Sequence, residues 1–246
     1  MPIARGLIRH ALPALALGAA MGCWLFGPPG MLLFGPGGGA LAAILWLVAR
    51  RAPRLATVAA LLAAAAALHA SSTLGWGAAD APDGTRYKVS PVGLSHVLTP
   101  HQPISRTIDC GWYGASRYEE PCAIAEGGTM PFAILRSVYP LVLSAALCCV
   151  IGAALSVTRR TRSAHYRSLA AGGAALTALT AVVLFAWSAG PALEPLRDLA
   201  VGTGGSLGTM QLTTAILLSV AAVSIPPHRL YVSLTVPDPL AAEPPR

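Results

Sequence analysis

The chain has 246 residues, of which 54% are hydrophobic and only 11% are charged, and its mean hydropathy is +0.61. A typical soluble domain carries about 25% charged residues, so this chain has too few ionic side chains to cover a water-soluble surface. The composition excludes a cytosolic enzyme and predicts an integral membrane protein. Although the net charge is +7, we expect no nucleic-acid partner, because no soluble segment combines a basic stripe with interleaved aromatic side chains.

Apolar stretches of roughly 20 residues predict membrane-spanning helices. Six such stretches predict an all-α polytopic membrane protein: residues 11–26, 31–49, 54–75, 132–157, 166–189 and 207–225. We expect four regions: an N-terminal helical hairpin plus a third helix (1–76), an extracytoplasmic cap (77–131), a three-helix region (132–225) and a flexible cytoplasmic tail (226–246).

The first two stretches are separated only by Gly27-Pro28-Pro29-Gly30, and the second is interrupted by glycines around Pro36. They form either a tight helical hairpin or a re-entrant pair. Backbone freed by a helix break is tolerated in lipid only where protein or a cavity surrounds it. We therefore expect the segment around Pro36 to face other helices.

The N-terminus has a second interpretation. Basic residues and an apolar run end in Ala20-Met21-Gly22-Cys23, which is similar to a lipoprotein cleavage box. A Leu is usual where Ala20 stands, and cleavage would leave the arginines at 50, 51 and 54 without a topological explanation. We favour a retained first helix.

Arginine clusters predict the orientation, because Lys and Arg of short loops mark the cytoplasmic side. With six spans, one side receives all of these arginines: Arg5, Arg9, Arg50, Arg51, Arg54, Arg159, Arg160, Arg162, Arg167 and Arg229. The opposite side receives eight of the ten acidic residues: Asp80, Asp83, Asp109, Glu119, Glu120, Glu126, Glu194 and Asp198. We expect a bacterial-type inner-membrane protein with both termini in the cytoplasm.

The cap is the only long hydrophilic segment. Residues 86–89 and 104–108 predict short strands, and prolines punctuate the rest. Cys110 and Cys122 are the only cysteines outside the predicted spans, on the side where oxidation is possible. We predict a disulfide between them, which would stabilise the cap by about 3 kcal/mol in the chain-entropy model. The alternative is two free thiols.

Cys110-Gly111-Trp112 and Cys122 lie in an external loop that follows one helix and precedes three others. This arrangement resembles the claudin-type tetraspan family. That family places Gly-Leu-Trp before its first Cys, whereas Gly111 and Trp112 follow Cys110 here, and the two N-terminal spans have no counterpart. The resemblance covers topology and a few residues, and it implies no function for this chain.

Two histidines of the cap, His96 and His101, are weak candidates for a zinc or copper site, with Asp83 and Asp109 nearby in sequence. Their four-residue separation in a Pro-rich loop fixes no geometry. The favoured interpretation is therefore two ordinary exposed histidines, and we expect no cofactor.

Ionisable residues inside spans are functional candidates, because charge is costly in the membrane. His69 and Arg136 are such candidates, and Gln211 is a polar candidate in the outer turn of the last span. Each also has a structural interpretation: a hydrogen bond for His69, anchoring at the interface for Arg136, and helix packing around Gln211. The structural interpretations are favoured.

Motifs of soluble catalysis are missing: the sequence has no phosphate-binding loop, no HExxH helix and no GxSxG elbow, and no Asp or Glu lies within a predicted span. We expect a non-catalytic accessory or scaffolding subunit, with a membrane-protein partner or further copies of itself. The alternative is a small-molecule transporter or channel subunit with a path near Pro36, His69 and Gln211. A membrane enzyme that uses His96 and His101 is the third class.

Overall fold

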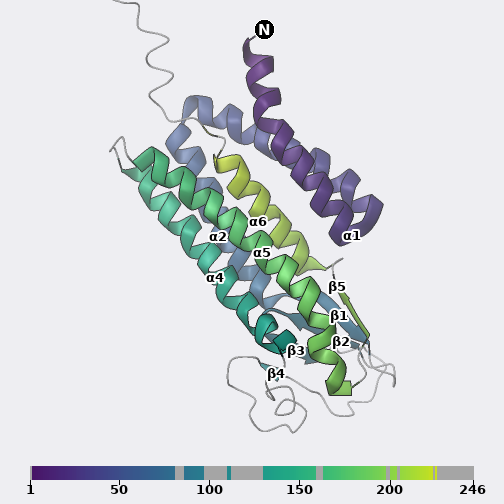
Figure 1. Cartoon of the computed structure of the whole chain (residues 1–246). Coiled ribbons are helices and arrows are strands. Elements are labelled where there is room, and N and C mark those ends of the chain that lie inside the picture. The colour runs from purple at the N-terminus through teal and green to yellow at the C-terminus, as the bar shows by residue number, and fades with distance from the viewer. Residues whose placement is uncertain are drawn as a thin grey trace, which may run out of the picture.

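The computed structural model describes residues 2–80, 86–96, 110–111, 130–158, 163–197, 200–203, 206–223 and 225 (Figure 1). The helices are α1 (Pro2–Arg51), α2 (Pro53–Thr73), α4 (Met130–Val157), α5 (Ser163–Arg197) and α6 (Leu207–Val223). The strands are β1 (Gly77–Asp80), β2 (Arg86–Ser90), β3 (Gly93–His96), β4 (Cys110–Gly111) and β5 (Ala200–Thr203).

Four described helices are long and apolar enough to cross a membrane: Ala11–Arg51, Pro53–Thr73, Ala133–Val157 and His165–Ala192. Leu207–Val223 is a shorter apolar helix. The protein is thus mostly helical and has the helices of a membrane protein, as its composition predicts. The expected count of six spans depends on how α1 and α6 cross the bilayer.

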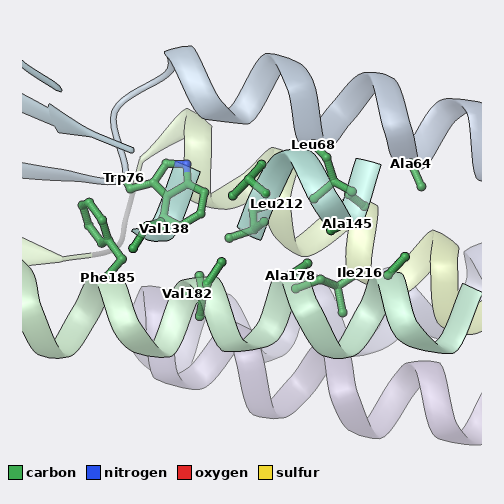
Figure 2. Packing of buried hydrophobic residues seen from close by; sticks show 14 of the residues in the cluster. Ala64, Leu68, Trp76, Val138, Ala145, Ala178, Val182, Phe185, Leu212 and Ile216 are labelled. Atoms are coloured by element: carbon green, nitrogen blue, oxygen red, sulfur yellow. The ribbon is translucent and has the colours of Figure 1, made fainter. Parts of the chain in front are cut away.

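Helices α2, α4, α5 and α6 form a bundle in which each runs antiparallel to the next along the chain (Figure 1). From α2 onward, the described elements follow the order α2, β1 to β4, α4, α5, β5 and α6. Aliphatic side chains from all four helices fill the bundle centre (Figure 2). Among them are Leu68, Val138, Ala145, Ala178, Val182, Leu212 and Ile216.

Helix α1 contains one non-helical residue, Gly27, with φ 70° and ψ −166°. A positive φ suits glycine because it has no Cβ. The chain reverses there, and the two arms lie against each other through small residues: a Cβ on Gly22 would clash with the Gly30 carbonyl, and one on Gly38 would lie 2.7 Å from the Ala14 oxygen. Helix α1 therefore folds back on itself at Gly27, a geometry that a membrane-spanning hairpin and a re-entrant pair share.

The expectation that the segment around Pro36 breaks the helix and faces other helices is wrong for Pro36 itself. Helix α1 continues through it, and Pro36 is exposed, whereas Gly35, Gly38 and Gly39 are buried. Buried glycines let the second arm approach the first arm and Leu217 of α6. The proline ring fits on the opposite face, where no neighbouring backbone crowds it.

Beyond the bundle end lies a five-stranded antiparallel sheet with the order β4-β3-β2-β1-β5 (Figure 1). The expected strand at 86–89 is confirmed as β2, whereas 104–108 lies outside the described residues. Strand β5 comes from the connection between α5 and α6 and pairs with β1, from Gly77 opposite Thr203 to Asp80 opposite Ala200. The sheet therefore unites two segments that are far apart in sequence.

Candidate functional site

Trp76 stands at the junction between the sheet and the bundle. It is fully buried, its indole Nε1 donates a hydrogen bond of 2.8 Å to the Ser71 carbonyl, and its backbone N–H donates one of 2.7 Å to the Val89 carbonyl. Its ring meets Phe185 of α5 edge to face, with centroids 5.2 Å apart (Figure 2). One residue therefore connects α2, β2 and α5.

The start of α6 is attached to the same junction. The Ser206 hydroxyl donates to the Gly75 carbonyl, and the Ser206 N–H donates to Thr209 Oγ1 at 3.1 Å. The Thr209 N–H in turn donates to Ser206 Oγ at 3.4 Å, as in a helix N-cap. A Cβ on Gly208 would lie 2.5 Å from the Gly75 oxygen and 2.7 Å from Trp76 Cδ1, so only glycine fits.

Tyr87 and Val89 of β2 turn into this junction and are almost completely buried. Between them in sequence, Lys88 extends its Nζ toward the Thr73 carbonyl at 3.4 Å, at the end of α2. A cation beside the last carbonyls of a helix is favourable. The sheet is therefore fixed on the end of the bundle. Its outer surface is the best-defined candidate site among the described residues.

The structure separates the predicted intramembrane candidates. His69 and Arg136 are exposed on the outside of the bundle, on α2 and α4 respectively. Gln211 is half-buried on α6, and its Oε1 is buried without a hydrogen-bond partner.

The cap candidates are only partly described. Cys110 forms β4, where its backbone pairs with Leu94, and His96 pairs through its backbone with Tyr87. The side chains of Cys110 and His96, and all of Cys122 and His101, lie outside the described residues. The disulfide and the metal site stay predictions. The side chains that are described include no group of three His, Cys, Asp or Glu that could hold a metal ion.

Small residues of the last two helices have two different roles. Gly208 allows a close backbone approach. Gly172 and Gly173 have nothing within 4 Å of a Cβ built on them. Ala171 and Ala174 are the buried neighbours on α5. The helix interface of α5 is therefore made by alanines, while these two glycines lie on its open face.

Sequence reasoning missed Trp76, Ser206 and Arg167 as key residues. Ser206 and Thr209 follow the N-cap spacing, so the helix start had a local signal. Gly75-Trp76-Gly77 directly after a span was a weaker one, since a tryptophan at a span end equally suits the membrane interface. Burial of Arg167 had no local signal, because it follows Arg159, Arg160 and Arg162 closely in sequence, and such a cluster predicts exposed residues of a loop.

A scan against protein-family models and a search of curated proteins find no match to this chain. The functional assignment rests on the geometry of the bundle, the sheet and their junction.

Proposed function

We propose that this chain is a non-catalytic integral membrane protein that acts as an accessory or scaffolding subunit of a membrane complex. It crosses the bacterial inner membrane six times, with both termini in the cytoplasm and a cap closed by the Cys110–Cys122 disulfide. The two arms of α1 count as separate spans in this proposal. Its partners are the lipid bilayer and another membrane protein, or further copies of itself.

The observation that carries the proposal is the apolar filling of the bundle centre. Leu61, Leu68, Val142, Leu212 and Ile216 are all at most 1% exposed, so aliphatic packing fills the bundle centre. The buried hydroxyls of the helices, such as those of Ser156, Ser188 and Thr213, donate to carbonyls of their own helix. Close packing of aliphatic side chains suits a rigid support and not a path for a polar solute.

The sheet supports the same proposal. It is attached to the end of α2, to Phe185 of α5 and to the start of α6 by buried Trp76 and by the bond from Ser206 to Gly75. A sheet held in this way keeps a constant position relative to the membrane surface, which is what a scaffold needs in order to present a partner.

The test is the native mass of the gently solubilised protein, tagged at its C-terminus, together with the identity of whatever co-purifies. We expect a foreign membrane subunit in a fixed stoichiometry. A disruptive change at the junction, Trp76→Ala, is expected to reduce its recovery more than Trp187→Ala does, because Trp187 is 61% exposed on α5. A monomer alone would contradict the proposal.

The alternative is a small-molecule transporter or channel subunit, and one observation favours it. The buried Oε1 of Gln211 has no partner among the described residues, and a polar ligand or water would satisfy it. The other two members of the expected path, Pro36 and His69, are exposed on the outside of the helices. Solute flux into proteoliposomes that contain this chain alone, lost in Gln211→Leu, would favour this alternative over the scaffold.

A further inference from the structure

Among the described residues, the bundle end opposite the sheet carries arginines and no acidic side chain. Arg50 and Arg51 end α1, Arg54 lies in the first turn of α2, and all three are exposed. The sequence has no acidic residue before Asp80, none from 127 to 193 and none from 199 to 237. The one ion pair found among the described side chains, Arg86 with Asp80, belongs to the sheet.

The three arginines lie around a sharp corner between two helices. Ala52 leaves helical geometry, with φ −142° and ψ 69°, and Pro53 begins α2. No side chain caps this helix start, and no acidic residue lies in its first turn. The guanidinium of Arg50 stacks over the Trp46 ring, 5.4 Å from its centroid, which holds that charge beside a buried aromatic residue.

A fourth arginine lies behind the corner. Arg167 of α5 is only 7% exposed, and its Nη2 donates a 3.4 Å hydrogen bond to the Ile225 carbonyl, while its Nε is buried without a partner. Ile225 packs in turn against Ala49 and Ala56, which flank the corner. Arg167 and the three corner arginines are more than 100 positions apart in sequence. Ile225 links the buried charge of Arg167 to the segment that carries the three exposed charges.

Apolar side chains adjoin the corner on both helices. Leu47 is 50% exposed and Leu55 is 67% exposed. A ligand that contacts both the arginines and the leucines needs an anionic headgroup and a hydrocarbon chain. Free phosphate would use only the arginines, whereas an anionic phospholipid matches the arginines with its phosphate and the leucines with its acyl chains.

We propose that the corner between α1 and α2 is a binding site for an anionic phospholipid of the leaflet that it faces. Arg50, Arg51 and Arg54 hold the headgroup phosphate, and Leu47 and Leu55 contact the acyl chains. Arg167 adds positive potential from behind and fixes α6 against the corner. This site is independent of whether the protein acts as a scaffold or as a transporter.

Native mass spectrometry of the purified full chain tests the site, with phosphatidylglycerol and phosphatidylcholine of identical acyl chains offered in equal amounts. The wild type is expected to retain more phosphatidylglycerol than phosphatidylcholine, and the ratio of the two is the preference. Each arginine near an anionic surface changes the preference about fivefold, so the triple variant Arg50→Gln/Arg51→Gln/Arg54→Gln is expected to retain both lipids nearly equally. Arg86→Gln, which removes one charge at the sheet, is the control and is expected to keep the preference.

Single variants keep the test decisive where the triple variant folds poorly. Arg54→Gln is expected to lower the preference about fivefold, and Arg54→Lys to retain most of it. An unchanged preference in Arg54→Gln and in the triple variant would overturn the proposal. Retention of inorganic phosphate by the wild type with no preference between the two lipids would also overturn it, because the corner would then take free phosphate.

Discussion

Trp76 and Phe185 meet edge to face with their ring centroids 5.2 Å apart and their planes at 67°. This contact joins the segment directly after α2 to the middle of α5, across 109 positions of the chain. Edge-to-face pairs stabilise by about 0.5–1.5 kcal/mol beyond the burial of their surface. The pair therefore helps to decide where the sheet sits on the bundle.

Truncation of Trp76 should destabilise the protein strongly. Trp76→Ala removes the ring contact, the hydrogen bond to Ser71 and a fully buried side chain, so we expect a loss of about 3–5 kcal/mol. Trp187→Ala removes the same type of side chain from an exposed position and should change stability much less. Thermal unfolding in detergent compares the two. Equal melting temperatures would contradict the role of Trp76.

A methyl group at Gly208 should not be tolerated. Gly208→Ala places a Cβ 2.5 Å from the Gly75 oxygen and 2.7 Å from Trp76, which forces α6 away from the junction. We expect a loss of about 1–3 kcal/mol. Gly172→Ala is the matched control, because nothing lies within 4 Å of its Cβ, and it should be neutral or stabilising by up to about 1 kcal/mol. Both are measured by the same thermal unfolding experiment.

The cap disulfide predicts a pattern of redox sensitivity. Cys110→Ser and Cys122→Ser should lower stability by the same amount, about 3 kcal/mol, and a reducing agent should lower the wild type to their level. Cys23→Ser should change nothing in this assay, since Cys23 is a free exposed cysteine of α1. Mass spectrometry of alkylated protein counts the free thiols. Five alkylated cysteines without reduction would show that the disulfide is absent.

Topology mapping decides how α1 crosses the membrane. The two arms turn at Gly27, so a reporter fused after Gly30 should be extracytoplasmic, while one fused after Arg51 should be cytoplasmic. The second fusion is the control, because the arginines at that corner favour the cytoplasm. A cytoplasmic reporter at Gly30 would make α1 re-entrant and reduce the number of spans.

Local sequence determined the helices, because a long apolar stretch satisfies its backbone only as a helix in a membrane. Residues 54–75 and 132–157 accordingly match α2 and α4 closely. Strand β2 also had a local pattern. The turn at Gly27 was visible from its glycines and prolines, although the choice between a hairpin and a re-entrant pair was not.

Only the tertiary structure decided the site. Four-residue β5 has no strand pattern of its own, and it becomes a strand because β1 supplies its hydrogen-bond partners. Burial of Trp76 and Arg167, and exposure of Pro36 and His69, depend on which helix face meets a neighbour. Hydropathy gives the depth of a residue in the membrane, whereas the direction of its side chain is decided by contacts between segments far apart in the chain. That is the physical reason why the apolar helices were readable from the sequence and the buried contacts between them were not.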